Sequence, residues 1–129
     1  MYPLLQINNL QIDFVTENGT ITAVRDISLK INRNEIVGIA GESGSGKSVT
    51  SLAILRLLSS KTARFPKGEI LFSEDGIQQV DLLKINDEQL RNIRGKQIAM
   101  IFQEPMTSLN PVFTCGNQVM ESILLHSCL

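Results

Sequence analysis

The octapeptide at residues 41–48, GESGSGKS, is the feature that most constrains what this chain can fold into. It matches the pattern G-x-x-x-x-G-K-[ST] at every fixed position. Its glycines permit backbone angles that residues with a β-carbon avoid, so successive N–H groups can turn toward one centre. The positive end of a following helix adds to that concavity, which then attracts anions. The pattern therefore predicts a loop that holds the phosphates of a nucleotide.

The charged and hydroxyl side chains of this loop have separate expected roles. Lys47 would reach the β- and γ-phosphates as a point charge, and the Ser48 hydroxyl would ligate Mg²⁺. The competing interpretation is a glycine-rich turn with an incidental Lys-Ser pair, which the flanking segments disfavour. The predicted nucleotide-binding residues are Gly41, Glu42, Ser43, Gly44, Ser45, Gly46, Lys47, Ser48 and Val49.

The segments on either side of the loop fit a strand–loop–helix order. The run EIVGIAG before the loop is almost continuously apolar, as a strand buried on both faces of a parallel sheet must be. After the loop, Leu52, Leu55 and Leu58 recur at helical spacing, which predicts an amphipathic helix from about Lys47 to Leu58. A second apolar run, over about residues 97–102, predicts another buried strand.

The first 35 residues predict an antiparallel β layer. The segment 4–14 is β-rich but is interrupted by Asn8-Asn9, which suggests strand pieces at an edge. Asn18-Gly19 is a strong hairpin signal, and residues 32–35 indicate a second turn.

The part of the chain after the first helix predicts shorter elements with clear boundaries. We expect a strand over residues 67–73 and a turn at residues 74–76. Asn86 can cap a helix with Gln89 at the capping-box position, and Gly95 ends it. Thr114 can cap a final helix.

Composition limits the classes of protein to consider. The 129 residues are 43% hydrophobic and 19% charged, which describes one globular domain. With a net charge of −1 and no basic block, nothing in the composition supports nucleic-acid binding. The N-terminus lacks the basic and apolar regions of a signal peptide. Cys115 and Cys128 are too few to indicate a disulfide framework.

The position of the loop within the chain separates the classes of nucleotide-binding protein. Small-molecule kinases and small GTPases carry this loop close to their start, and no convincing Asn-Lys-x-Asp guanine-reading motif is found here. An ABC-type ATPase places a β layer before the loop, as about 35 residues do in this chain.

Two long segments then carry a specific resemblance. Residues 23–55, AVRDISLKINRNEIVGIAGESGSGKSVTSLAIL, resemble the opening of an ABC transporter nucleotide-binding domain. Residues 98–123, IAMIFQEPMTSLNPVFTCGNQVMESI, resemble the Q-loop region of the oligopeptide/dipeptide and nickel permease ATPases.

The resemblance implies an α/β fold of the P-loop NTPase class, ABC ATPase type. It would consist of an N-terminal antiparallel β layer (about 1–35), a partial parallel-sheet core with the P-loop (about 35–103), and the Q-loop with the start of a helical subdomain (about 103–129).

The resemblance also assigns roles to single residues. Gln103 is similar to the Q-loop glutamine, which contacts Mg²⁺ or the attacking water, and is expected to act in catalysis with Lys47. Phe14 is similar to the aromatic that stacks on adenine, although core packing explains an aromatic at a strand end equally well. Val49 replaces the threonine of many ABC domains, which puts a hydroxyl contact to the α-phosphate in doubt. His126 lies too early to be the family's switch histidine and is interpreted as a helix-surface residue.

The family's later motifs are not found in these 129 residues. They are the Leu-Ser-Gly-Gly-Gln signature, a second apolar strand that ends in the Walker B Asp-Glu pair, and the switch histidine. We therefore expect a partial domain, cut short before the helical subdomain is complete. Its apolar strands would have unpaired edges, so we also expect the isolated chain to be unstable or prone to aggregate.

Three functional hypotheses follow from the resemblance. The leading one is the ATP-binding part of an ATPase that powers peptide or nickel import, with ATP and Mg²⁺ as cofactors. Its partners would be a second ABC ATPase subunit, membrane permease subunits and, indirectly, a substrate-binding protein, at the cytoplasmic face of the cell membrane. The alternatives are a truncated fragment that binds nucleotide without hydrolysing it, and a non-transport ABC ATPase.

Overall fold

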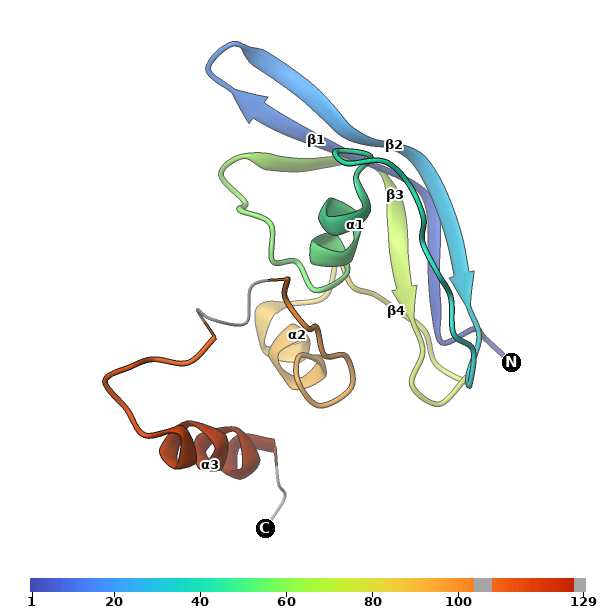
Figure 1. Ribbon diagram of the computed structural model, residues 1–129. Helices are drawn as coiled ribbons and strands as arrows, with labels where there is room; N and C mark the ends of the chain where they lie inside the picture. The colour runs from blue at the N-terminus through green and yellow to red at the C-terminus, as the bar shows by residue number, and fades with distance from the viewer. Residues whose placement is uncertain (104–107, 127–129) are drawn as a thin grey trace. The chain divides into compact units, whose positions relative to one another are not determined.

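The computed structural model describes residues 1–103 and 108–126 (Figure 1). The chain divides into two compact units, Met1–Leu90 and Arg91–Leu129. The elements in chain order are β1 (Leu5–Thr16), β2 (Gly19–Ile31), α1 (Lys47–Ile54), β3 (Ala63–Phe72), β4 (Val80–Asp81), α2 (Asp87–Ile93) and α3 (Cys115–His126).

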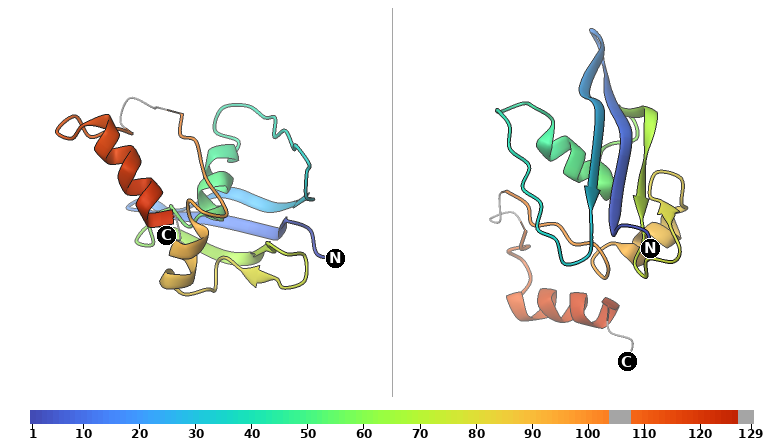
Figure 2. Two further views of the ribbon diagram at one scale, coloured as in Figure 1. Left: turned by 90° about the horizontal axis from the view of Figure 1, so that it is seen from below. Right: turned by 90° about the vertical axis from the view of Figure 1, so that its right-hand side faces the viewer.

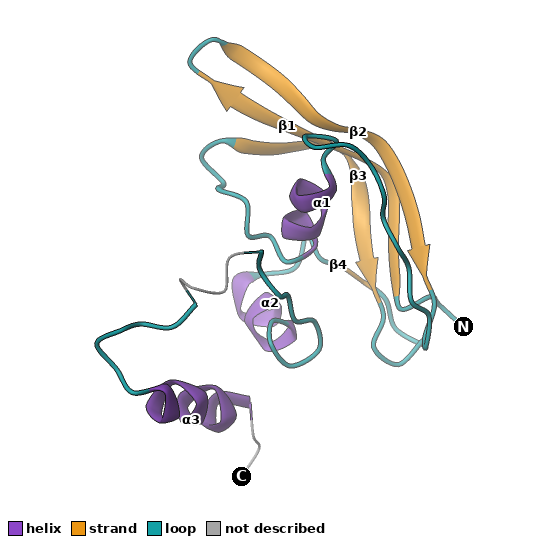
Figure 3. Ribbon diagram, viewed as in Figure 1, coloured by secondary structure: helices purple, strands orange, loops and turns teal. Residues whose placement is uncertain are grey.

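The first unit is built on one antiparallel sheet with the strand order β2-β1-β3-β4 (Figure 3). β1 and β2 form a hairpin whose last pair is Thr16 opposite Gly19, as the Asn18-Gly19 signal predicted. β3 then returns to pair with the other edge of β1. The core of this unit is apolar, and its most buried side chains come mainly from the two central strands: Ile7, Leu10, Ile12, Ile70, Leu82 and Leu90.

β1 differs from the prediction because it is one continuous strand in the interior of the sheet. Asn9 does not break it but forms a bulge with φ 45°. Between Asn8 and Gln11, β1 spans three steps while β3 spans two, and the same excess occurs against β2 between Ile7 and Leu10. Asparagine tolerates left-handed backbone angles better than most residues, which explains why it stands at the extra position.

Gly68 of β3 lies directly against this bulge. Its φ is +96°, and a β-carbon there would lie 2.5 Å from Leu10 Cα and 2.7 Å from the carbonyl oxygens of Asn8 and Asn9. All three of these atoms belong to backbone, which cannot turn away as a flexible side chain can. The bulge therefore requires glycine at position 68.

Hydrogen bonds from polar side chains stabilise the exposed side of the bulge. The Asn9 amide donates to Asp26 Oδ1 at 3.0 Å, and the Ser28 hydroxyl accepts the Asn9 N–H at 2.9 Å. Lys67 Nζ lies 3.3 Å from the same Asp26 oxygen. Asp26 itself has φ 53° and marks a second irregularity, in β2. The hydrogen bonds from Asn9 and Lys67, together with the charge of Lys67, lower the pKa of the Asp26 carboxyl below its usual 3.8.

This cluster leads to a prediction about pH. Because the folded-state pKa of Asp26 is lowered, its stabilising contribution is present above the unfolded-state pKa and is lost as the pH falls through the folded-state value. We expect an NMR titration of the Asp26 carboxyl to give a pKa below 3.8, and Asn9→Ala to raise that pKa. A wild-type Asp26 pKa at or above 3.8 would contradict the hydrogen bonds described here.

The helices begin where their caps predict. Gln89 N–H donates to Asn86 Oδ1 at 2.8 Å and Asn86 N–H donates to Gln89 Oε1 at 3.3 Å, which completes the capping box of α2. Thr114 Oγ1 accepts from Asn117 N–H at 3.3 Å at the start of α3. α1 ends at Ile54, four residues earlier than predicted, and Arg56 with φ 49° takes the chain out of the helix. In the views of Figure 2, α1 lies beside the sheet, next to β2.

The two predicted buried strands are not formed in the described residues. Residues 35–40 and 99–102 are loops, and residue 98 makes only an isolated bridge with Arg94. Ile36 is 101% exposed and Ile101 is 97% exposed, so neither side chain is buried. A strand needs a neighbour to accept its hydrogen bonds, and neither segment is part of the four-strand sheet. The apolar pattern alone was insufficient to predict a strand.

The second unit contains the end of α2, the turn at Gly95 and α3. Gly95 has φ 79° and ends α2, as predicted. No α3 residue is buried, and five large apolar side chains of this helix are at least half exposed: Val119, Met120, Ile123, Leu124 and Leu125. Within the described ranges, no helix combines the length and apolar character needed to span a bilayer.

Candidate nucleotide-binding loop

The octapeptide predicted to hold phosphates leads directly into α1. Gly46 is the N-cap residue, with φ 90° and ψ 1°, and Lys47 is the first residue of the helix. Gly44 also has a positive φ, of 80°. Two left-handed glycines so close together curl the backbone ahead of the helix, where the first N–H groups have no partner within the helix. Loop and helix are thus arranged as the motif predicted.

Gly46 is also held close to the sheet. A β-carbon at this position would lie 2.8 Å from the Ala23 carbonyl oxygen and 3.0 Å from Val24 Cγ2, both in β2. The N-terminal end of α1 can therefore approach β2 only with glycine at position 46. The contact with β2 therefore fixes the position of Gly46, the residue at which the loop ends and α1 begins.

The Lys47 side chain folds back onto the loop that precedes it. Its Nζ donates to the carbonyl oxygens of Gly41 and Glu42, at 2.6 Å each, and lies 3.1 Å from Ser45 Oγ. A β-carbon on Gly41 would lie 2.7 Å from Ser45 Oγ, so the loop closes tightly on itself at this point. An ammonium group held against the loop by two of its carbonyl oxygens is placed to meet an anion that enters the loop.

A hollow of about 420 Å³ adjoins the loop and is bounded by the first unit alone. Its lining combines the β2 residues Ile27, Ser28 and Leu29 with residues of the loop and α1: Gly38, Ile39, Ala40, Gly41, Ser45, Lys47 and Thr50. The lysine is the charged group in this lining. The hollow therefore offers one positive charge within a mixed apolar and backbone surface.

The three side chains that follow Lys47 lie in different environments. Ser48 is exposed, Val49 is half-buried, and Thr50 is only 4% exposed. Thr50 Oγ1 donates to the Gly46 carbonyl oxygen at 2.9 Å. Ser48 is thus the hydroxyl available to a ligand of the loop, while that of Thr50 is directed into the helix.

Comparison with known protein families identifies the group to which this loop belongs. A family model described as "ABC transporter" matches residues 24–126. The chain belongs to the ABC transporter family.

Individual relatives in this family are import ATP-binding proteins by name. "Glutathione import ATP-binding protein GsiA" of Salmonella paratyphi A is 51% identical over 123 residues, which are 95% of this chain and 20% of that protein. "Putative peptide import ATP-binding protein BOV_A0348" of Brucella ovis is 48% identical over 124 residues, which are 96% of this chain and 37% of that protein. The chain therefore spans between a fifth and about two fifths of the length of these relatives.

The two residues assigned by resemblance belong to different units of the chain. Phe14 is half-buried in β1, opposite Ile21 of β2 and Ala63 of β3, and does not line the hollow beside the loop. Gln103 is exposed in the second unit of this ABC chain, and the next two residues of the Q-loop region, Glu104 and Pro105, lie outside the described residues. The adenine and Q-loop roles stay predictions.

His126 is exposed at the last position of α3, as predicted for a helix-surface residue. Its imidazole lies above Gly95, where a β-carbon would approach Nε2 to 2.7 Å. Among the described residues of the ABC chain, no three side chains of the His, Cys, Asp or Glu type gather as a metal site would require.

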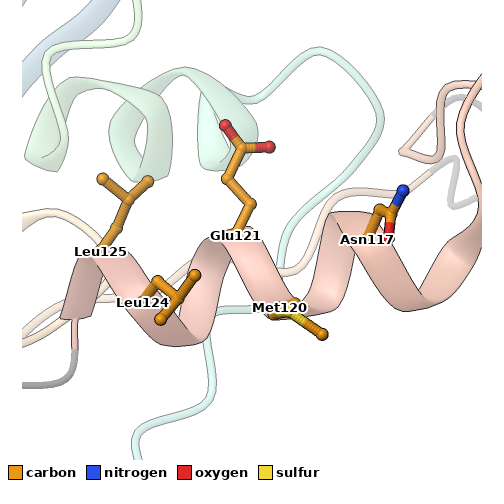
Figure 4. Close-up of a pocket in the computed structure, with 5 residues that line it drawn as sticks. All are labelled: Asn117, Met120, Glu121, Leu124 and Leu125. Atoms are coloured by element: carbon orange, nitrogen blue, oxygen red, sulfur yellow. The ribbon is translucent and has the colours of Figure 1, made fainter.

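α3 carries a second, shallow hollow of about 370 Å³ (Figure 4). Met120 and Leu124 point to one side of the helix, and Glu121 and Leu125 point to the other. Asn117 completes the lining. This surface is largely apolar and belongs to the second unit.

Sequence reasoning missed two features of the loop. It did not predict the bond from Thr50 to Gly46 or the approach of Gly46 to Ala23. A threonine four residues after a helix-capping glycine is a usable signal for the first, because threonine hydroxyls bond back to the carbonyl four residues earlier. The second depends on which strand lies beside the helix, and the local sequence does not contain that information.

Proposed function

We propose that this chain is the ATP-binding part of an ABC importer ATPase whose cargo is a peptide. The observation that carries the proposal is the Gly41–Ser48 loop at the start of α1, with Lys47 Nζ held against it by the carbonyl oxygens of Gly41 and Glu42. Membership of the ABC transporter family supports the nucleotide assignment. The names of the relatives support peptide over nickel as cargo, since glutathione is itself a short peptide.

The loop residues can bind a triphosphate in a simple way. Lys47 would exchange its bonds to the loop carbonyls for bonds to phosphate oxygens, which are stronger acceptors because they carry charge. The N–H groups at the start of α1 would point at the same oxygens. Phosphoryl transfer depends mainly on such positioning and on electrostatic stabilisation.

Ser48 is the residue that would hold Mg²⁺ on the nucleotide. Its hydroxyl is exposed beside the loop, whereas the described residues offer no ready cluster of acidic ligands. Magnesium is often bound through one or two protein oxygens, with phosphate oxygens and water as the other ligands. The ion would neutralise charge that develops on the phosphates.

The proposed partners follow from the same assignment. A second ATPase subunit and membrane permease subunits would complete the importer, and a substrate-binding protein would act through the permease. The ATPase would then work at the cytoplasmic face of the membrane. Phe14 and Gln103 are proposed to contact adenine and the Mg²⁺ or attacking water, respectively.

Titration of the full chain with ATP tests this function. We expect binding that is tighter with Mg²⁺ than with EDTA. Ser48→Ala should remove most of that difference, on the order of tenfold, because the serine hydroxyl is the proposed protein ligand of the ion. Isothermal titration calorimetry in the two buffers measures this difference in ATP affinity for wild type and Ser48→Ala. Equal affinity of wild type in both buffers would contradict the role of Ser48, and no binding at all would contradict the function.

A second candidate is nucleotide binding without hydrolysis. It is favoured because the family's Walker B pair, whose glutamate would polarise the attacking water, is not found in these 129 residues. Steady-state phosphate release from ATP separates the two candidates. Release that depends on Lys47 supports the ATPase, and binding with no release supports the second candidate.

A further inference from the structure

Thr50 makes a pair of hydrogen bonds that the nucleotide-binding motif does not specify. Its side chain is buried on α1, at 4% exposure. Both its hydroxyl and its backbone N–H donate to the carbonyl oxygen of Gly46, at 2.9 Å each. One carbonyl is therefore held by two donors of the same residue.

The Gly46 carbonyl belongs to the residue at which the loop ends and α1 begins. Gly46 has φ 90° and ψ 1°, outside the helical region. On its other side it lies against β2, where the Ala23 carbonyl oxygen and Val24 Cγ2 leave no room for a β-carbon. Gly46 is thus fixed by the sheet from one direction and by Thr50 from the other.

Fixing the Gly46 carbonyl also fixes the N–H of the next residue. In a planar trans peptide, the C=O of residue 46 and the N–H of residue 47 point in opposite directions. Because the Gly46 carbonyl is directed down the helix toward Thr50, the Lys47 N–H is directed back toward the loop. That N–H belongs to the first turn of α1, where backbone donors have no partner within the helix.

We propose that Thr50 is a positioning residue for phosphate binding, acting through the Gly46 carbonyl to aim the Lys47 N–H into the loop. The inference rests on the proposed function, since it names a residue that supports the same site. Thr50 does not contact the nucleotide, because its hydroxyl is buried and bonded to Gly46. Its effect is on how well the loop is arranged for an anion before the nucleotide binds.

A purely structural role for Thr50 would give a different result. A buried threonine that only fills space would affect folding stability and leave nucleotide affinity alone. The backbone bond from residue 50 survives any side-chain substitution, so the Gly46 carbonyl keeps one donor when the hydroxyl is removed. Removal of the hydroxyl therefore leaves no buried group unpaired, and its effect on stability should be small.

Two pairs of variants in the full chain isolate the hydroxyl. Thr50→Val replaces the hydroxyl by a methyl group of similar shape, and Thr50→Ser and Thr50→Ala differ from each other by the hydroxyl alone. We expect Thr50→Val and Thr50→Ala to weaken ATP binding roughly 3- to 10-fold, the contribution of one hydrogen bond. Thr50→Ser should bind like wild type. Calorimetric titration with ATP and Mg²⁺ measures affinity, and thermal melting without nucleotide measures stability.

Ser51→Ala is the matched control. The Ser51 hydroxyl makes the same type of bond, to the Lys47 carbonyl oxygen at 3.2 Å. That carbonyl belongs to the peptide between residues 47 and 48, which does not contain the Lys47 N–H, so its bond to Ser51 does not set the direction of that donor. We expect ATP affinity within about twofold of wild type for this variant.

The outcomes distinguish this inference from the proposed function. ATP binding by wild type with unchanged affinity in Thr50→Val and Thr50→Ala overturns the positioning role and leaves the function standing. Equal losses in Thr50→Ser and Thr50→Ala also overturn it, because the hydroxyl would then not matter. If Thr50→Val does not fold, the serine and alanine pair decides. Absence of ATP binding by wild type overturns both proposals.

Discussion

Replacing Lys47 by alanine should reduce ATP affinity by about 100-fold or more. The ammonium group is held against the loop by two carbonyl oxygens at 2.6 Å and a hydroxyl oxygen at 3.1 Å. In the complex it would form charge-assisted bonds to phosphate oxygens, each worth about 1.5–3 kcal/mol, so the loss of two of them gives this factor.

The same substitution should leave the nucleotide-free chain nearly as stable as wild type. The bonds from Lys47 to Gly41, Glu42 and Ser45 are exposed, so water can replace the ammonium group at these oxygens. Lys61→Ala is the matched control, because it removes an exposed lysine outside the loop in the same unit and should not change affinity. Titration calorimetry with ATP measures the affinity, and urea denaturation of the nucleotide-free chain measures its stability. Similar ATP affinities for Lys47→Ala and wild type would refute the nucleotide-binding assignment.

The largest loss of stability is expected for Gly68→Ala. A β-carbon at this position would lie 2.5 Å from Leu10 Cα and 2.7 Å from two carbonyl oxygens of β1. The φ of +96° adds strain for any residue with a side chain. Together, overlap and strain should cost on the order of 3 kcal/mol or more, a large share of the stability of a domain of this size. Urea denaturation followed by circular dichroism measures the change.

Gly19→Ala separates the two causes of that loss. Gly19 also has a positive φ, of +122°, but no atom lies within 4 Å of the place where its β-carbon would stand. This variant should therefore show the backbone strain alone, about 1–2 kcal/mol. If Gly68→Ala were no more destabilising than Gly19→Ala, the close approach of β3 to the bulge would not hold in solution.

Features governed by local chemistry were predictable from the sequence. The Asn18-Gly19 hairpin, the Asn86 and Gln89 capping box and the Thr114 cap each depend on residues within four positions of one another, and the structure confirms them. The loop at residues 41–48 belongs to the same group, since its turn depends on its own glycines.

Features that depend on distant partners were not predictable in this way. Residues 35–40 and 97–102 have the composition of buried strands, but composition does not supply a neighbouring strand. The local sequence predicts an interruption of an edge strand at Asn9, whereas β2 and β3 flank β1 on both sides and Asn9 forms a bulge. The bond from Thr50 to Gly46 could have been suspected, but its role depends on the approach of β2.

The bulge at Asn9 has a consequence for the phase of β1. Side chains of a regular strand alternate between the two faces of a sheet, so apolar residues belong at every second position. The buried residues of β1 instead stand at positions 5, 7, 10 and 12, with one interval of three. The bulge accommodates the extra residue in that interval, so all four side chains stay on the core face. The bulged backbone at Asn9 thus restores the phase of the strand, and with regular pleating through the same sequence Leu10 and Ile12 would face the side opposite to Leu5 and Ile7.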